Sequence, residues 1–187
     1  MKVALLSILI ASTIAFAQTS EKPAEHPAPA DKVLTLAITV PAPRPEVWHA
    51  FATSEGLSTW LTPGAVVDLR PGGEWTGHYP GGKTSGGTIV SLVPEEELVI
   101  SAMAPEQFPT VRATRTHARF RFKSEGNSTV VELEQTGWQS GEEWDKAYEY
   151  LFQGNAYLLA TLHRRFVNGP LDWAKEWGTP KKSGDTE

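Results

Sequence analysis

The sequence contains no cysteine, which excludes disulfide bonds, thiolate metal sites and a lipid-carrying cysteine behind a leader segment. It also has no excess of basic side chains, since 17 Lys and Arg residues stand against 22 Asp and Glu residues, a formal net charge of -5. An acidic chain without a basic cluster argues against a nucleic-acid partner. The one long apolar run, residues 3–16, is too short for a usual membrane span.

Recognisable catalytic motifs are missing as well. There is no GxSxG or HExxH motif, and the five histidines have no spacing typical of metal ligands. The segment 77–84 (GHYPGGKT) matches the letters of a phosphate-binding loop, but the residues after it predict a strand where that loop needs a helix. We interpret it as the tip of a hairpin. The sequence therefore predicts no catalytic residue, no metal site and no cofactor.

The N-terminal segment has the layout of a secretory signal peptide. Lys2 precedes the apolar run, and small residues, Ala15 and Ala17, stand just before the expected cleavage point after Ala17. We expect a signal peptide at residues 1–17, a flexible tether rich in Pro and Ala at 18–32, a folded domain at 33–167 and a C-terminal extension at 168–187. The mature protein would then be periplasmic or secreted, with no membrane span after cleavage.

The clearest helical pattern covers residues 140–166. Ser140 and Glu143 form a capping-box pair, and the sequence Asn-Gly-Pro at 168–170 ends the helix. Its apolar stripe, at spacings of three and four, is interrupted by one polar residue, Asn155. That amide would either line a ligand cavity or bond a neighbouring group inside an ordinary core. A shorter helix holding Trp173 and Trp177 is expected in the extension, without an assigned role.

Most of the remaining chain predicts short strands. Residues 33–40 alternate between apolar and polar, and short helices are expected after Pro45 and, capped by Ser54, around Leu57. Further strands follow, ending in a predicted hairpin of residues 111–122 and 129–136. The hairpin puts Arg and Glu side chains on a solvent-facing side and apolar side chains on the other. We predict an α+β fold in which a curved antiparallel sheet supports the long helix.

Several segments together resemble the SRPBCC (START-like) superfamily, in the branch named for the C-terminal domain of the activator of the heat-shock-protein ATPase. The resemblance covers about residues 33–166. It rests on segments 45–51 (PEVWHAF), 71–75 (PGGEW), 87–90 (GTIV), 128–133 (STVVEL) and 136–138 (TGW), with Leu57, Trp60, Leu92, Pro94, Leu98 and Val99 between them.

This resemblance implies a helix-grip fold, in which an antiparallel sheet wraps the C-terminal helix, two short helices close one end and an apolar cavity lies between. Residues expected to point into that cavity as ligand-binding residues are Trp60, Trp75, Met103, Phe120, Tyr148 and Asn155. The alternative is that these aromatic side chains simply fill the core. Because the signal peptide separates this protein from a cytosolic chaperone, activation of that ATPase is not expected.

Three functions remain open. The first is a secreted, non-catalytic protein that binds a small apolar or aromatic ligand in the cavity. The second is an enzyme of the cyclase, dehydratase or lyase type, which needs an acid or base inside the pocket and would be favoured if Glu74 or His78 lay there. The third is a protein-interaction module, related to chaperone regulators, that uses Trp173 and Trp177 as an exposed apolar patch.

Overall fold

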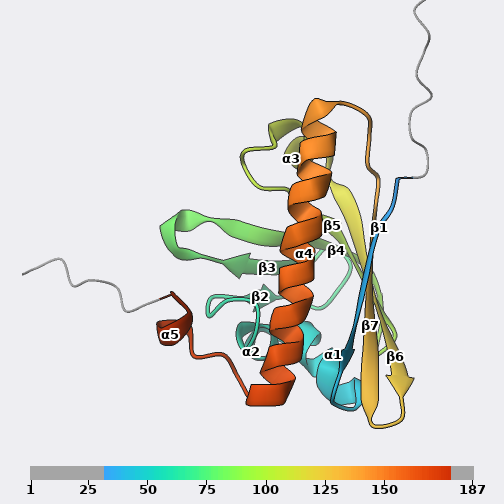
Figure 1. The fold of residues 1–187 in the computed structure, drawn as a ribbon, viewed down its shortest axis with the longest axis vertical. Helices are drawn as coiled ribbons and strands as arrows, with labels where there is room; N and C mark the ends of the chain where they lie inside the picture. The colour runs from blue at the N-terminus through green and yellow to red at the C-terminus, as the bar shows by residue number, and fades with distance from the viewer. Residues whose placement is uncertain (1–31, 178–187) are drawn as a thin grey trace, which may run out of the picture.

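The computed structural model describes residues 32–177 (Figure 1). The predicted signal peptide, nearly all of the predicted tether and the last ten residues lie outside the described residues. Within residues 32–177, no helix combines the length and the apolar character needed to cross a membrane.

A single antiparallel sheet forms the base of the fold. Its seven strands follow the order β1-β7-β6-β5-β4-β3-β2, so all neighbours except β1 and β7 are consecutive in the chain. The strands are β1 (Leu34–Val40), β2 (Val66–Val67), β3 (Glu74–His78), β4 (Thr84–Val93), β5 (Glu97–Ala102), β6 (Thr116–Glu125) and β7 (Ser128–Thr136).

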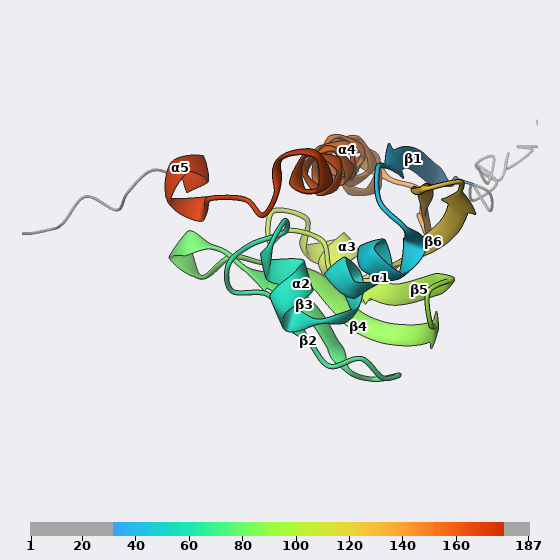
Figure 2. The same cartoon turned by 90° about the horizontal axis from the view of Figure 1, so that it is seen from below.

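The long helix α4 (Glu142–Asn168) lies across the sheet, and the view along its axis shows the sheet curving beneath it (Figures 1 and 2). Helices α1 (Arg44–Ala52) and α2 (Ser54–Ser58) close the lower end, where Phe51 and Trp60 enter the core. The remaining helices are α3 (Pro109–Thr114), α5 (Trp173–Trp177) and the 3-10 turn Pro80–Gly82. The predicted α+β helix-grip fold is thereby confirmed.

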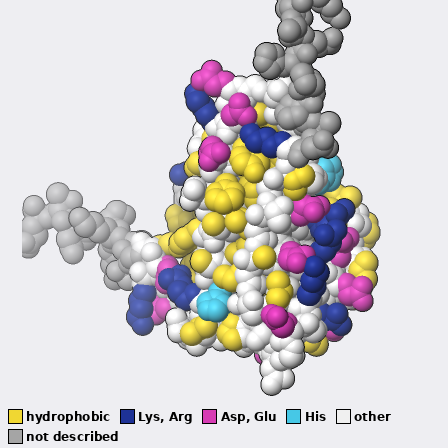
Figure 3. All heavy atoms as spheres, turned by 45° about the vertical axis from the view of Figure 1, so that its right-hand side comes forward, with side chains coloured by type: hydrophobic (Ala, Val, Ile, Leu, Met, Phe, Trp, Pro, Cys, Tyr) yellow, Lys and Arg dark blue, Asp and Glu magenta, His cyan; other side chains and the backbone are white. Residues whose placement is uncertain are grey.

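The hairpin of β6 and β7 has the predicted faces. Arg119 pairs with Glu134 in the register, and Arg121 pairs with Glu132. Arg119 Nη1 lies 3.1 Å from Glu134 Oε1, while Phe120 on the other face is 2% exposed. Basic and acidic side chains accordingly stand next to one another on the right-hand side of the molecule in Figure 3. This face is a solvated surface of mixed charge.

The predicted end of α4 before Gly169 is confirmed, but both predicted N-terminal helix caps, Ser140 and Ser54, are wrong. Helix α4 begins after Gly141 without a side-chain cap, and the Glu143 carboxylate instead accepts hydrogen bonds from Thr110 N, Thr110 Oγ1 and Val111 N at 2.7, 2.7 and 3.1 Å. These bonds, led by the one from the Thr110 hydroxyl, lower the pKa of Glu143. For α2, the cap is Thr53, whose Oγ1 accepts from Gly56 N at 2.9 Å.

The predicted strand over residues 111–122 is also wrong in its first half, which forms α3. Pro109 stands at the first turn of α3, where its fixed φ suits a helix and its missing N–H costs nothing. The Glu143 carboxylate then satisfies two free N–H groups of that first turn. Arg115, at φ 70°, ends the helix, and β6 starts at the next residue.

Candidate functional site

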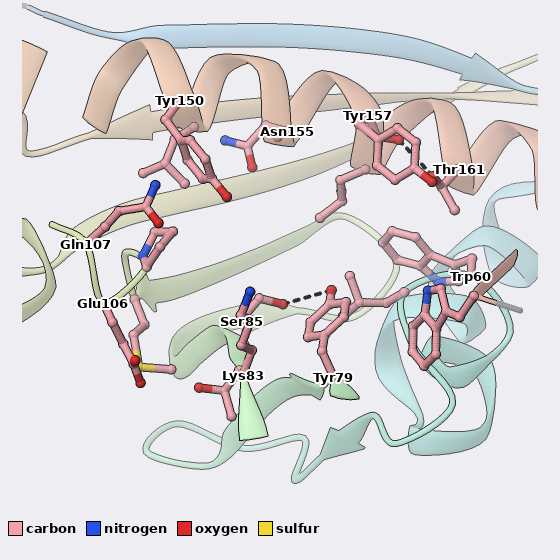
Figure 4. Close-up of a pocket in the computed structure, with 18 of the residues that line it drawn as sticks. Trp60, Tyr79, Lys83, Ser85, Glu106, Gln107, Tyr150, Asn155, Tyr157 and Thr161 are labelled. Carbon is pink, nitrogen blue, oxygen red and sulfur yellow. Dashed lines mark hydrogen bonds between the residues drawn. The ribbon is translucent and has the colours of Figure 1, made fainter. Parts of the chain in front are cut away.

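A pocket of about 500 Å³ lies on the side of α4 that faces the β3–β4 hairpin (Figure 4). Its other walls come from the segment between β5 and α3, the residues that follow α2 and the C-terminal helix α5. The lining residues are Trp60, Leu61, Tyr79, Lys83, Thr84, Ser85, Met103, Pro105, Glu106, Gln107, Arg112, Tyr150, Leu151, Gly154, Asn155, Tyr157, Leu158, Thr161, Trp173, Glu176 and Trp177.

Helix α4 offers the pocket one continuous face. Leu151, Gly154, Leu158 and Thr161 recur at spacings of three and four, so they lie above one another on the helix. At Gly154, an added Cβ would meet no heavy atom of the described chain within 4 Å. A glycine inside a helix lowers the stability of the helix by about 1 kcal/mol relative to alanine. The missing side chain therefore leaves open space in the helix wall of the pocket.

Asn155 belongs to a chain of three side-chain amides and hydroxyls. Its Nδ2 donates to Gln135 Oε1 at 2.8 Å, and Gln135 Nε2 donates to Thr116 Oγ1 at 2.7 Å. Gln135 and Thr116 are 3% and 1% exposed, so these hydrogen bonds satisfy groups that water does not reach. Both readings of Asn155 thus hold, because it bonds a core residue and lines the pocket, where its oxygen points into the open space (Figure 4).

Helix α5 closes the end of the pocket near the tip of the β3–β4 hairpin, beside which it lies in Figure 2. Trp173 Nε1 donates to the Ser58 carbonyl oxygen at 2.8 Å, and Arg164 Nη2 lies 2.8 Å from Glu176 Oε2. The Trp177 ring centroid is 5.1 Å from that of Trp173 and 6.1 Å from that of Tyr79. The two tryptophans that the sequence left without a role are therefore parts of the pocket wall.

Tyr79 connects the hairpin to this aromatic wall. Ser85 Oγ donates to the Tyr79 hydroxyl oxygen at 3.1 Å across the tip of the β3–β4 hairpin. Burial raises the pKa of Tyr79, the hydrogen bond from Ser85 opposes that shift, and the nearby Tyr157 adds to it. The Tyr79 hydroxyl therefore stays neutral and remains a hydrogen-bonding group at physiological pH.

The ionisable groups of the lining have mixed signs. Lys83 and Arg112 are basic, Glu106 and Glu176 are acidic, and Arg112 Nη1 donates to the Ala104 carbonyl oxygen at 2.6 Å. Within residues 32–177, no cluster of three or more His, Asp or Glu side chains could hold a metal ion.

The structure separates the six residues that were predicted to bind a ligand. Trp60, Met103 and Asn155 line the pocket. Trp75 and Phe120, each 2% exposed, belong to the closed core below it. Tyr148 lies away from the pocket: its ring is 5.0 Å from that of Trp138, and its hydroxyl donates to the Val33 carbonyl oxygen at 3.2 Å.

Sequence reasoning missed most of the aromatic wall, namely Tyr79, Tyr150, Tyr157, Trp173 and Trp177. Counting three and four residues from Asn155 along the predicted helix would have identified Leu151, Leu158 and their neighbours. No local pattern places the hairpin tip or α5 opposite that face. The segment that matches a phosphate-binding loop forms the predicted hairpin tip, with Gly81 and Gly82 at φ 77°.

Solved structures with a similar fold include three bacterial proteins. Protein MLL2253 from Mesorhizobium loti is 17% identical, with a TM-score of 0.60 over 75% of this chain and 100% of that one. The Aha1 dimer from Colwellia psychrerythraea is 16% identical, with a TM-score of 0.62 over 74% and 98%. CalU16 from Micromonospora echinospora is 23% identical, with a TM-score of 0.55 over 75% and 76%. These likenesses show the fold alone.

A search among curated protein sequences finds no match. A family model, described as activator of Hsp90 ATPase homolog 1-like protein, matches residues 41–165, which is more than half of the chain. The matched residues begin directly after β1 and run almost to the end of α4, and α5 follows them. The chain belongs to the activator of Hsp90 ATPase homolog 1-like family.

Proposed function

We propose that this protein is a secreted or periplasmic binder that holds a small apolar or aromatic molecule in the pocket beneath α4. The observation that carries the proposal is a pocket of about 500 Å³ with aromatic side chains on several walls. Binding pockets for small molecules have volumes of about 300–1,000 Å³ and apolar linings with a few polar groups. Asn155, Tyr79 and Ser85 are such polar groups here.

The lining gives less support to the two other functions. Glu74 and His78, which would have favoured a lyase-type enzyme, are exposed on β3 and lie outside the lining. Trp173, which would have favoured a protein-interaction surface together with Trp177, is partly buried and bonded to Ser58, and Trp177, although 40% exposed, lines the pocket beside it. Binding without chemistry is therefore the function we propose.

The test is to fill the pocket from Gly154, where an added Cβ meets no heavy atom of the described chain within 4 Å. Gly154→Phe places a ring in the open space at Gly154, while Gln153→Phe puts the same ring on the exposed side of α4. We expect the neutral dye Nile red to bind the wild type and Gln153→Phe equally. Gly154→Phe should bind it at least about tenfold more weakly, a loss of 1.4 kcal/mol or more.

Circular dichroism of both variants checks that α4 is retained. Equal dye binding by all three proteins, or none by the wild type, would refute a ligand function for this pocket. Native mass spectrometry of the protein as purified would in addition reveal a ligand carried from the cell.

The location is tested separately. Cell fractionation followed by N-terminal sequencing should find the protein outside the cytoplasm and beginning at Gln18. A cytoplasmic protein that retains Met1 would refute secretion without touching the proposed binding.

A further inference from the structure

The most exposed aromatic side chains within residues 32–177 gather at the pocket. Among the described residues, the large apolar side chains with the greatest exposure include three aromatic ones, Tyr150, Tyr157 and Trp177, at 49%, 67% and 40%. All three line the pocket, and the others in that set are aliphatic side chains that lie elsewhere. Ring surface that a core would normally cover is therefore kept accessible at this one place.

The arrangement of the rings next to Trp177 suits a planar ligand. Trp177 is tilted by 41° to Trp173 and by 43° to Tyr79, at centroid distances of 5.1 and 6.1 Å. Aromatic rings prefer offset or tilted contacts at about 4.5–7 Å, and a pair adds roughly two- to tenfold to an equilibrium beyond the burial of its area. A ring that enters the pocket can extend this cluster, whereas an alkyl chain gains burial alone.

The polar part of the pocket offers an acceptor. Asn155 uses Nδ2 to bond Gln135 Oε1, and its own oxygen points into the pocket (Figure 4). Among the described residues, no side-chain or backbone donor bonds that oxygen. Since Gln135 is 3% exposed and is itself held by Thr116, the amide of Asn155 is fixed from behind. A ligand hydroxyl or N–H group would complete its hydrogen bonding.

The charges of the lining favour a neutral ligand. Glu176 is already paired with Arg164, and Arg112 Nη1 donates to the Ala104 carbonyl oxygen. The two other charged lining residues, Lys83 and Glu106, are exposed to solvent and opposite in sign. A charged ligand would therefore leave water without gaining a buried partner of opposite charge that is free to pair with it.

We infer that the ligand of this pocket is a neutral, planar aromatic molecule with a hydrogen-bond donor, of the phenol or hydroxy-arene class. Its ring lies against the wall that α5 provides, and its donor bonds the oxygen of Asn155. The inference rests on the proposed function and narrows it. Helix α5 lies beyond the segment that the family model matches.

Equilibrium dialysis with four probes, each competing with Nile red, tests the inference on the whole chain. Naphthol has the ring and the donor, methylnaphthalene has the ring alone, dodecanol has a donor on an alkyl chain, and naphthoate carries a charge. We expect naphthol to bind about fivefold or more tightly than methylnaphthalene, as one net hydrogen bond allows. It should also bind more tightly than dodecanol and naphthoate.

Two variants assign the preference to residues. Asn155→Leu should bring the ratio of naphthol to methylnaphthalene affinity close to one, while Gln153→Leu, the loss of an exposed amide on the same helix, should leave it unchanged. Trp177→Leu should weaken the binding of naphthol and of methylnaphthalene and leave the binding of dodecanol unaffected. Phe152→Leu, a partly buried ring of α4 outside the pocket, is its control.

The outcomes separate this inference from the proposed function. Nile red binding that Gly154→Phe blocks, together with dodecanol or naphthoate binding at least as tightly as naphthol, would overturn the inference and leave the binding function. The same holds if Asn155→Leu keeps the wild-type ratio. If neither Nile red nor any probe binds, both are overturned.

Discussion

The aromatic side chains of this protein are divided between a closed core and an open pocket wall. In the core, the Phe51 ring has the rings of Trp60, Phe120 and Phe122 at centroid distances of 4.8, 5.2 and 4.9 Å, and all four side chains are at most 2% exposed. In the pocket wall, Tyr157 and Trp177 are 67% and 40% exposed.

The two groups are held in place in different ways. Trp60 and Trp75 each send an indole N–H into the core, where they donate to the carbonyl oxygens of Ala50 and Phe51 at 2.8 and 2.9 Å. They thereby satisfy acceptors in the last turn of α1 and fill the space around it. Trp173 makes the same kind of bond, to Ser58, but from a short helix with no buried residue. The core aromatics thus stabilise the fold, and the wall aromatics keep ring surface free.

The sharpest test of this division is Phe51→Ala. Phe51 is fully buried at the centre of the closed core, so its loss should lower the free energy of unfolding by about 3–5 kcal/mol. Trp177→Ala, which removes a larger but partly exposed ring, should cost less than about 1 kcal/mol. Urea unfolding followed by circular dichroism measures both. Similar losses for the two variants would show that α5 is part of the core.

Asn155→Leu tests the polar boundary between the two regions. The change leaves Gln135 Oε1 without its donor in a buried position, which should lower the free energy of unfolding by about 1–3 kcal/mol. Gln153→Leu, on the exposed side of α4, should change it by less than about 0.5 kcal/mol. If the two variants unfold at the same urea concentration, the bond to Gln135 contributes no stability.

These two regions also show which structural features could be predicted from the sequence. Alternation in β6 and β7 and the 3.6-residue period of α4 predict which faces are buried, because burial of one face imposes those periods. The same patterns do not distinguish Trp60, a core ring that also reaches the pocket, from Trp75, which lies in the core alone. That distinction depends on which surfaces meet across the fold.

Tyr148 illustrates the same limit within one helix. It belongs to the apolar stripe of α4 together with Asn155, but near the start of the helix the stripe packs on a second cluster that contains Trp138 and Trp144. The Glu143 bonds to α3 were equally hidden, since their partners are 32 and 33 residues away in the chain. Local sequence patterns predicted most of the helices and strands. Contacts between segments that are distant in the chain determine which residues cap the helices and which line the pocket.

A smaller effect of opposite sign is expected at Gly154. Gly154→Ala should raise the free energy of unfolding by about 1 kcal/mol, because alanine favours the helix and its Cβ enters open space. Ala160→Gly, an exposed position on the same helix, should lower it by about the same amount. Thermal unfolding of both variants provides the measurement. A loss of stability in Gly154→Ala would mean that the pocket is narrower than described.

The smallest effect concerns Tyr79, whose pKa depends on how well the aromatic wall of the pocket excludes water from its hydroxyl group. Burial raises this pKa in the folded protein above the ordinary value of 10.0, so the folded state holds the phenolic proton more tightly than the unfolded state does. The resulting stability is present below pH 10.0 and is lost as the pH rises through the folded pKa. Tyr79→Phe should therefore lose less stability than the wild type above pH 10.0.

The titration of Tyr79 can also be followed directly by the carbon NMR signal of its ring, assigned by comparison with Tyr79→Phe. A ligand that covers the ring removes more water from the hydroxyl and should raise the pKa further. Titration of the free protein at the ordinary value would show that water reaches Tyr79 freely and that the wall is more open than its contacts with Ser85 and Trp177 indicate. An unchanged pKa in the presence of a bound ligand would place that ligand away from the aromatic wall.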